Sequence, residues 1–204
     1  DVLMPPGVCG WGVAFDGRVL LVSDWSSQLH KIDPCTGTLL ETLDMPSVEG
    51  AWGLEWDNDA LWVADFWGRK IVRIDPATGQ ALKTLSIPPG YLNPIGVAVG
   101  NGAVWVGLDG ATGTVLKMDA EDGTVLASWN FTPLTGGVVF GLEYGKAALW
   151  VAAQDSGYES HPQYALIHKL NPANGAILGS FRSTAVTIYV LAMDPTGLLW
   201  YTTP

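Results

Sequence analysis

Short hydrophobic runs alternate with turn sequences along all 204 residues of the chain. One apolar run, with Gly at its first or second position in four of the five copies, recurs at residues 11–16, 52–57, 96–99, 141–144 and 190–194. A second run, often containing Trp, follows each one, at residues 20–24, 61–65, 104–106, 149–151 and 199–201. Runs of this length between Gly, Asp, Asn and Pro predict short β-strands joined by tight turns.

A third and a fourth run complete four of the five repeats. The third ends in a turn such as Asp33-Pro34-Cys35-Thr36-Gly37, in which Pro presets φ, Asp accepts backbone hydrogen bonds and Gly adopts positive φ. The fourth lies at residues 39–43, 81–85, 125–129 and 177–181. Four strands in about 41 to 45 residues make one blade of a β-propeller. The sequence therefore predicts an all-β propeller that forms a single domain over residues 1–204.

The predicted blades cover residues 10–46, 51–88, 94–132 and 139–181, with an incomplete fifth blade at 188–204. Residues 1–5 resemble residues 42–46, the end of an outer strand, so we expect them to complete the fifth blade and close the ring. The third strand of that blade is missing from the pattern. An unpaired strand edge favours association with another chain.

Charge and composition restrict the partners. A formal net charge of −10 argues against binding to nucleic acid or to an anionic membrane, both of which need a basic surface. No apolar run approaches the roughly 18 residues of a membrane span, so insertion into a membrane is not expected. The chain begins at Asp1 without an initiator Met, as a processed end would, and we expect an extracellular or cell-surface location.

Two glutamates interrupt a position that is otherwise alanine. Glu55 and Glu143 stand where other first strands have Ala14, Ala98 and Ala192. First strands line the axis of a propeller, where a buried carboxylate is costly unless it is paired, protonated or bound to a metal. The two side chains either form an axial pair that divides acid and base roles or holds a cation, or each bonds backbone amides or water. No cofactor is expected, and Ca²⁺ is the candidate if the pair binds a metal.

Aromatic and acidic residues gather in the loops before first strands and after second strands, which we expect on one face. The candidate binding residues there are Trp11, Trp25, Trp52, Trp67, Asp24, Asp65, Tyr158 and His161. Aromatic rings beside carboxylates suit a glycan or a protein partner. Asp24 and Asp65 have an alternative role in pairs within their own blades. Four further tryptophans recur at one second-strand position and predict packing between blades: Trp62, Trp105, Trp150 and Trp200.

The two cysteines are predicted on opposite faces of the propeller, Cys9 before a first strand and Cys35 in a turn between outer strands. An internal disulfide is therefore not expected. They are either two inert thiols or the two halves of a bond between stacked molecules, a contact that would build a filament.

The blocks 61–65 (Leu-Trp-Val-Ala-Asp) and 73–79 (Arg-Ile-Asp-Pro-Ala-Thr-Gly) resemble the NHL and virginiamycin-B-lyase-like group of propellers. This resemblance covers nearly the whole chain and implies the fold, but the group includes scaffolds, binding modules and enzymes. Its lyase members resemble a metal-dependent enzyme that uses paired His and Glu. That set has no counterpart here, because His30 and His168 lie in third strands more than two blades apart.

The chain also resembles the five-bladed glutaminyl cyclases. One segment of that family resembles residues 10–13 with 22–24, and another resembles Glu55-Trp56 with Trp62, Trp67 and residues 74–76. The second segment carries a catalytic Glu in that family, although its Asn-Glu-Leu-Glu core is replaced here by Ala-Trp-Gly-Leu-Glu at residues 51–55.

From these observations we interpret the chain as a non-catalytic secreted or cell-surface propeller. It would act as a scaffold that binds another protein or a glycan, or assembles with copies of itself into an oligomer or filament. The alternative is an enzyme with its site on the axis, either a metal-dependent lyase or a glutaminyl-cyclase-like acyl transferase, using Glu55 and Glu143. Convergence of the two glutamates on one solvent-open pocket, with a His or a metal nearby, would favour the enzyme.

Overall fold

The computed structural model describes residues 10–110, 113–131, 138–154, 165–183, 188–193 and 196–202. These residues form strands β1 to β18 and contain no helix. In this part of the chain there is accordingly no helix long and apolar enough to cross a membrane.

The strands form four antiparallel sheets of four and one antiparallel pair. The first sheet contains β1 (Val13–Phe15), β2 (Leu20–Ser23), β3 (Gln28–Ile32) and β4 (Leu39–Asp44), and the second contains β5 (Ala51–Asp57), β6 (Ala60–Asp65), β7 (Lys70–Ile74) and β8 (Ala81–Ser86). The third contains β9 (Pro94–Gly100), β10 (Ala103–Leu108), β11 (Thr114–Asp119) and β12 (Val125–Asn130), and the fourth contains β13 (Val139–Gly145), β14 (Ala148–Gln154), β15 (Ala165–Leu170) and β16 (Ile177–Arg182). The pair is β17 (Val190–Met193) with β18 (Leu199–Thr202).

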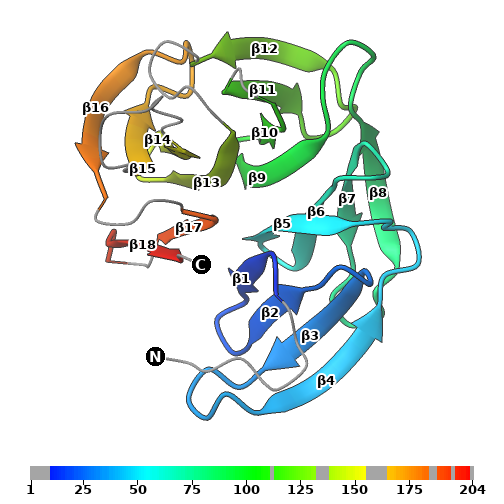
Figure 1. Ribbon diagram of the computed structural model, residues 1–204. Coiled ribbons are helices and arrows are strands. Elements are labelled where there is room, and N and C mark those ends of the chain that lie inside the picture. The colour runs from blue at the N-terminus through cyan, green and yellow to red at the C-terminus, as the bar shows by residue number, and fades with distance from the viewer. Residues whose placement is uncertain are drawn as a thin grey trace.

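The sheets follow one another in chain order around a ring, with β1, β5, β9, β13 and β17 nearest its centre (Figure 1). The all-β propeller predicted from the repeats is therefore confirmed. The fifth sheet has two strands among the described residues, as expected. The predicted closing strand at residues 1–5 lies outside the described part.

Strand pairing places the repeats in a common register. Glu55 lies opposite Trp62, Ala98 opposite Trp105 and Glu143 opposite Trp150. Ala14 lies opposite Leu21, and Ala192 lies opposite Trp200. The two glutamates thus occupy one equivalent position of the inner strands, in the second and fourth blades.

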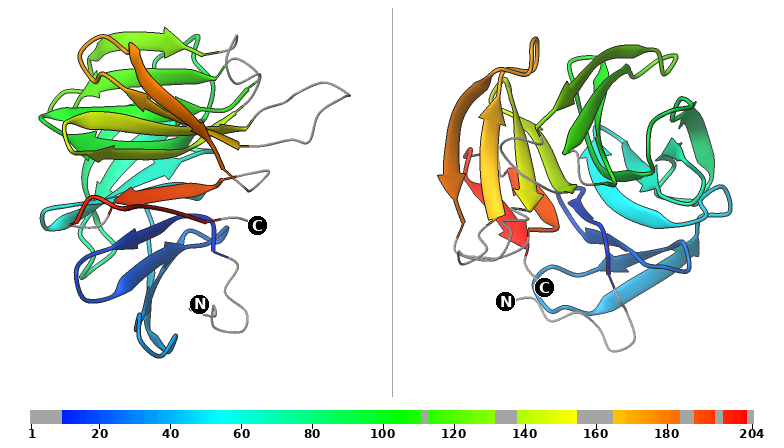
Figure 2. Two further views of the ribbon diagram at one scale, coloured as in Figure 1. Left: turned by 90° about the vertical axis from the view of Figure 1, so that its left-hand side faces the viewer. Right: turned by 45° about the horizontal axis from the view of Figure 1, so that its top comes forward.

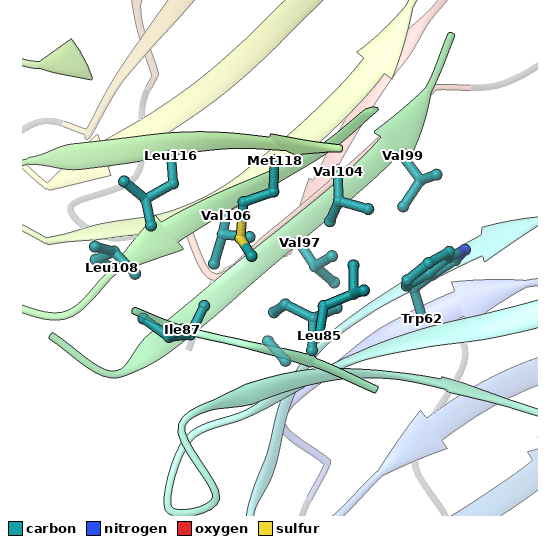
Figure 3. Packing of buried hydrophobic residues seen from close by; sticks show 12 residues of the cluster. Trp62, Leu85, Ile87, Val97, Val99, Val104, Val106, Leu108, Leu116 and Met118 are labelled. Carbon is teal, nitrogen blue, oxygen red and sulfur yellow. The ribbon is translucent and has the colours of Figure 1, made fainter. Parts of the chain in front are cut away.

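The core consists of separate hydrophobic clusters, each between two neighbouring blades. Figure 3 shows the cluster between the second and third blades, where Trp62 and Leu85 pack against Val97 and Val104. Similar clusters join the first blade to the second, the third to the fourth and the fourth to the fifth. Among the described residues, no such buried cluster joins the fifth blade to the first.

Glycines let the inner strands approach closely. A Cβ on Gly12, Gly53 or Gly96 would lie 2.3, 2.5 or 2.4 Å from the carbonyl oxygen of Trp52, Ile95 or Phe140 in the next blade. Real Cβ atoms do not come so close to a backbone oxygen, so no other residue fits at these positions without displacing the adjacent strand. The repeated Gly of the first strand therefore fixes the spacing of the blades around the axis.

Candidate active site

A cavity of about 600 Å³ lies where the inner strands end, between the first and fifth blades. Its walls are β1 with the turn after it, the second half of β5, Glu143 of β13, β17, and one residue of β18. The described lining residues are Val13, Ala14, Phe15, Asp16, Gly17, Glu55, Trp56, Glu143, Leu191, Ala192, Met193 and Trp200. Both axial glutamates therefore open into one space, as expected for an enzyme, but none of the described lining residues is the His that the same expectation placed nearby.

Both carboxyl groups are held in a state that favours protonation. Burial raises the pKa of Glu55 well above its ordinary value, and repulsion from Glu143 and then from Asp57 raises it further. Burial also raises the pKa of Glu143 to about 7, although a hydrogen bond from the backbone of Met193 acts in the opposite direction. Glu143 is 9% exposed, whereas Glu55 keeps more of its surface open to the cavity while protein atoms surround its carboxyl.

Two carboxyls that repel each other do not ionise independently, and the pair loses its protons in two separate steps. Between these two steps the pair holds one proton, so one carboxyl can accept a proton while the other donates one. A third acid of the lining, Asp16, has a structural role: its Oδ1 accepts the backbone N–H groups of Arg18 and Val19, both at 2.7 Å, and closes the β1–β2 turn.

The predicted aromatic face is assembled at the opposite end of the inner strands. Trp11 lies 4.7 Å between ring centroids from both Trp25 and Trp52, and Phe66 joins Trp52 to Trp67 at 4.8 and 4.7 Å. Trp25 and Trp67 are the exposed members, at 45% and 57%. The structure thus brings the four predicted tryptophans together, but none of them lines the cavity. Their role in binding stays a prediction.

The two aspartates predicted on that face are bonded within their own blades. Asp24 accepts the backbone N–H groups of Ser26 and Gln28 through Oδ1, and its Oδ2 lies 3.0 Å from His30 Nε2. Asp65 is fully buried. Its carboxylate accepts N–H groups from Glu49, Gly50 and Gly68 and pairs with Lys70, with Nζ 3.4 Å from Oδ2. These contacts match the alternative role expected for the two acids.

Other candidate residues contribute less to this site. Tyr158, His161 and Cys9 lie outside the described residues, and Cys35 is exposed in the turn between β3 and β4 as a free thiol. His30 and His168 are buried in β3 and β15, as expected. In the described ranges, no group of three or more His, Cys, Asp or Glu side chains is arranged to hold a metal ion.

The repeat pattern did not predict the part of the cavity wall that is formed by Phe15, Trp56, Met193 and Trp200. Trp200 was predicted to pack between blades. That holds for Trp62 and Trp105, which are 3% and 1% exposed, but Trp200 is 61% exposed. The physical reason is that its blade has no buried cluster shared with the first blade among the described residues. An alignment of the repeats would reveal the exposure of Trp200 only if each tryptophan were compared together with the residue of the next blade that packs against it.

The fold and the cavity define a β-propeller with a pair of carboxyls at its axis. Residues 7–92, which include Glu55, match the family model described as glutamine cyclotransferase. The family model supports the second resemblance drawn from the sequence, and the NHL and lyase-like resemblance is not shown. A search of curated proteins finds no significant sequence match.

Solved structures agree on the fold. Glutaminyl cyclase from Myxococcus xanthus is 14% identical with a TM-score of 0.68, over 95% of this chain and 84% of that one. Hydrazine synthase from Kuenenia stuttgartiensis is 15% identical with a TM-score of 0.62, over 93% of this chain, and this chain spans 60% of its length. The WD40 propeller domain of Doa1 is 11% identical with a TM-score of 0.62, over 94% and 74% of the two chains. At these identities the similarities establish the propeller fold.

These findings correct the main functional interpretation of the sequence. A non-catalytic scaffold or filament module is wrong as the first choice, because the family model matched by residues 7–92 is that of an enzyme. The scaffold hypothesis depended on the unfinished fifth blade, and the sequence left open whether Glu55 and Glu143 form an axial pair or each bonds backbone amides or water. Their convergence on one cavity, with raised pKa values, is tertiary information that the linear pattern does not contain.

Proposed function

We propose that the chain is an acyl-transferring enzyme of the glutaminyl cyclase type, which converts an amino-terminal glutamine into pyroglutamate and releases ammonia. The observation that carries the proposal is the shared cavity of Glu55 and Glu143, whose pKa values are both raised. The family match over residues 7–92 supports the choice of reaction. The volume of about 600 Å³ lies within the range of small-molecule sites and would hold the first residues of a peptide.

The reaction requires one proton acceptor and one proton donor. The neutral α-amine attacks the carbonyl carbon of the γ-carboxamide, a C–N bond forms, and the five-membered ring closes through a tetrahedral intermediate. The attacking nitrogen must then lose one proton, and the leaving nitrogen must gain one before its bond to carbon breaks. Ammonia leaves, and no electrons are exchanged with an outside partner.

A carboxyl pair that holds one proton matches this requirement. The ionised carboxyl takes the proton of the attacking nitrogen, and the protonated carboxyl gives its proton to the departing amide nitrogen. The pair still holds one proton at the end of the cycle, now on the other oxygen, so exchange with water restores the starting state. This chemistry uses Glu55 and Glu143 as catalytic residues and needs no metal ion.

The test is ammonia release from a glutaminyl dipeptide amide, with the pyroglutamyl product identified by mass spectrometry. Glu55→Gln and Glu143→Gln should each lower kcat/KM by about 10²- to 10⁴-fold, the usual contribution of a general acid or base. Glu41→Gln, which changes an exposed glutamate of β4 paired with Lys31, is the matched control and should keep the wild-type rate. No ammonia above the rate in buffer, or full activity in both axial variants, would refute the proposal.

A further inference from the structure

The junction between the fifth and first blades differs from the other junctions of the ring. Between the third and fourth blades, the ring of Trp105 stacks on Tyr144 of the next blade, with centroids 4.7 Å apart and planes 10° from parallel. In the common register, the counterpart of Trp105 in the fifth blade is Trp200, and the counterpart of Tyr144 in the first blade is Phe15. Phe15 and Trp200 would meet at this junction if the repeat were followed.

Instead, the two rings flank the cavity. Phe15 is 50% exposed and Trp200 is 61% exposed, against 1% for Trp105, and both line the cavity. At the other end of the inner strands the same two blades are in contact, because the ring centroids of Trp11 and Tyr189 lie 6.3 Å apart. Among the described residues, the two blades are therefore in ring contact where the inner strands begin and separated by the cavity where they end, and Glu55 and Glu143 line that cavity. Figure 1 shows β1 and β17 near each other where the first and fifth sheets meet, and the side view in Figure 2 shows the fifth sheet next to the first.

The residues that line this opening are mostly apolar or acidic, which determines the kind of ligand that it can bind. Eight of the twelve described lining residues are apolar: Val13, Ala14, Phe15, Trp56, Leu191, Ala192, Met193 and Trp200. Three of the others are acids, Asp16, Glu55 and Glu143, and none of the described lining residues is Lys, Arg or His. An amine is attracted to such a site, and a second carboxylate is repelled because none of the described lining residues carries a positive charge that could neutralise it.

We propose, on the basis of the cyclase function above, that Phe15 and Trp200 form the subsite for the residue after the glutamine, and that this subsite prefers an aromatic or large apolar side chain and rejects an acidic one. The side chain would enter the opening with its ring between Phe15 and Trp200, in the place that Tyr144 takes on Trp105. Met193 lines the same cavity and its backbone hydrogen-bonds Glu143, so the subsite and the carboxyl pair belong to one continuous site. Phe15 and Trp200 are thus specificity-determining residues outside the proton transfer.

Three substrates test the preference: Gln-Phe-amide, Gln-Ala-amide and Gln-Glu-amide, which differ only in the second side chain. Stacking between two rings should raise kcat/KM for the Phe substrate about tenfold above the Ala substrate, and the Glu substrate should fall about tenfold below it. Phe15→Ala should bring the ratio of Phe to Ala substrate close to one. Phe181→Ala changes another exposed phenylalanine, on the outer strand β16 and 45% exposed, and should keep the ratio. Phe15→Leu, which keeps an apolar side chain, should give an intermediate ratio and guards against misfolding of the alanine variant.

Binding of peptides that cannot cyclise separates this inference from the proposed function. Ala-Phe-amide has no γ-carboxamide, and calorimetry should show tighter binding of it than of Ala-Glu-amide, with about tenfold weaker binding to Phe15→Ala. If all three glutamine substrates react equally well, the subsite is refuted and the cyclase function stands. If none reacts but Ala-Phe-amide binds in a Phe15-dependent way, the cyclase function is refuted and the apolar subsite stands. If no peptide reacts or binds, both are refuted.

Discussion

Glu55 in β5 and Glu143 in β13 occupy the same register position two blades apart, each directly opposite a tryptophan of the next strand. Ala98 fills this position in the blade between them and is fully buried in the cluster that joins the third and fourth blades. Glu143 acts on Glu55 electrostatically and raises its pKa. The other three repeats have alanine at this position, so the two glutamates are the departure from the repeat that creates the carboxyl pair.

The stability of the protein should depend on pH through this pair. A carboxyl whose pKa is raised on folding binds its proton more tightly in the folded state, so unfolding becomes easier as pH rises. For Glu143 the window runs from the ordinary value of 4.5 to about 7. Glu143→Gln cannot ionise and should therefore be more stable than the wild type at pH 8, by at most about 3 kcal/mol, with little difference at pH 4.

Urea unfolding of the two proteins at pH 4, 6 and 8 measures this difference. The same variant should lose activity, so stability and catalysis change in opposite directions, as at other strained sites. Equal stability of Glu143→Gln and wild type at pH 8 would mean that the carboxyl is not held in a raised-pKa environment.

The rate should fall as the pair loses its last proton. Below the first pKa both carboxyls are protonated and no base remains, and above the second no acid remains, which gives a bell-shaped profile with one limb near pH 7. The α-amine of the substrate, with an ordinary pKa of about 7.7–8.0, would alone make the rate rise through this range. A fall in kcat/KM above neutral pH is therefore specific to the enzyme pair.

A pH profile from pH 4 to 10 with Gln-Ala-amide measures both limbs. A rate that rises to a plateau at high pH would show that no protonated carboxyl is needed. Glu41→Gln is again the control, because its ion pair with Lys31 is exposed and far from the cavity lining.

The sequence predicted the ring of blades and the equivalence of Glu55 and Glu143, because both depend on a period that is visible in the chain. It did not predict the environment of Trp200. Trp105 and Trp200 occupy equivalent strand positions, yet Trp105 is 1% exposed and Trp200 is 61% exposed. Exposure depends on the neighbouring blade, and the repeat pattern describes one blade at a time. For Asp24 and Asp65 the pattern left two roles open, partner binding and pairing within the blade. Only the fold shows which backbone N–H groups donate hydrogen bonds to them.

His168 should oppose the glutamates at acid pH. Burial lowers its pKa below the ordinary 6.5, so the unfolded chain binds a proton more readily and stability falls as pH drops below about 6.5. Its Nδ1 lies 2.7 Å from Ser180 Oγ, and its Nε2 is buried with no hydrogen-bond partner. His168→Leu places there the residue type that Leu116 supplies in the third blade. It should be more stable than wild type at pH 5, and the advantage should shrink at pH 7.5.

His30→Leu is the informative comparison for this variant. His30 occupies the same position of the first blade, but both of its ring nitrogens are bonded, to Thr42 and Asp24 at 3.0 Å each. Loss of these contacts should cost about 1–3 kcal/mol at both pH values. Identical pH dependence of His168→Leu and wild type in chemical denaturation would exclude a role for His168 in acid sensitivity.

The glycines of the inner strands should tolerate no side chain. In Gly53→Ala and Gly96→Ala, the new methyl group would lie 2.5 and 2.4 Å from a carbonyl oxygen of the next blade, so β9 or β13 would have to move outward. Overpacking of this kind costs about 1–3 kcal/mol and should lower the melting temperature. Gly179→Ala in β16 is the matched control, because a methyl group there meets nothing within 4 Å, and its stability should stay within about 0.5 kcal/mol of wild type. Because β9 lies between β5 and β13, the strands that carry Glu55 and Glu143, displacement of β9 or β13 should also lower activity more than the melting temperature alone would suggest. Equal stability of all three variants would show that the glycines do not set the spacing of the blades.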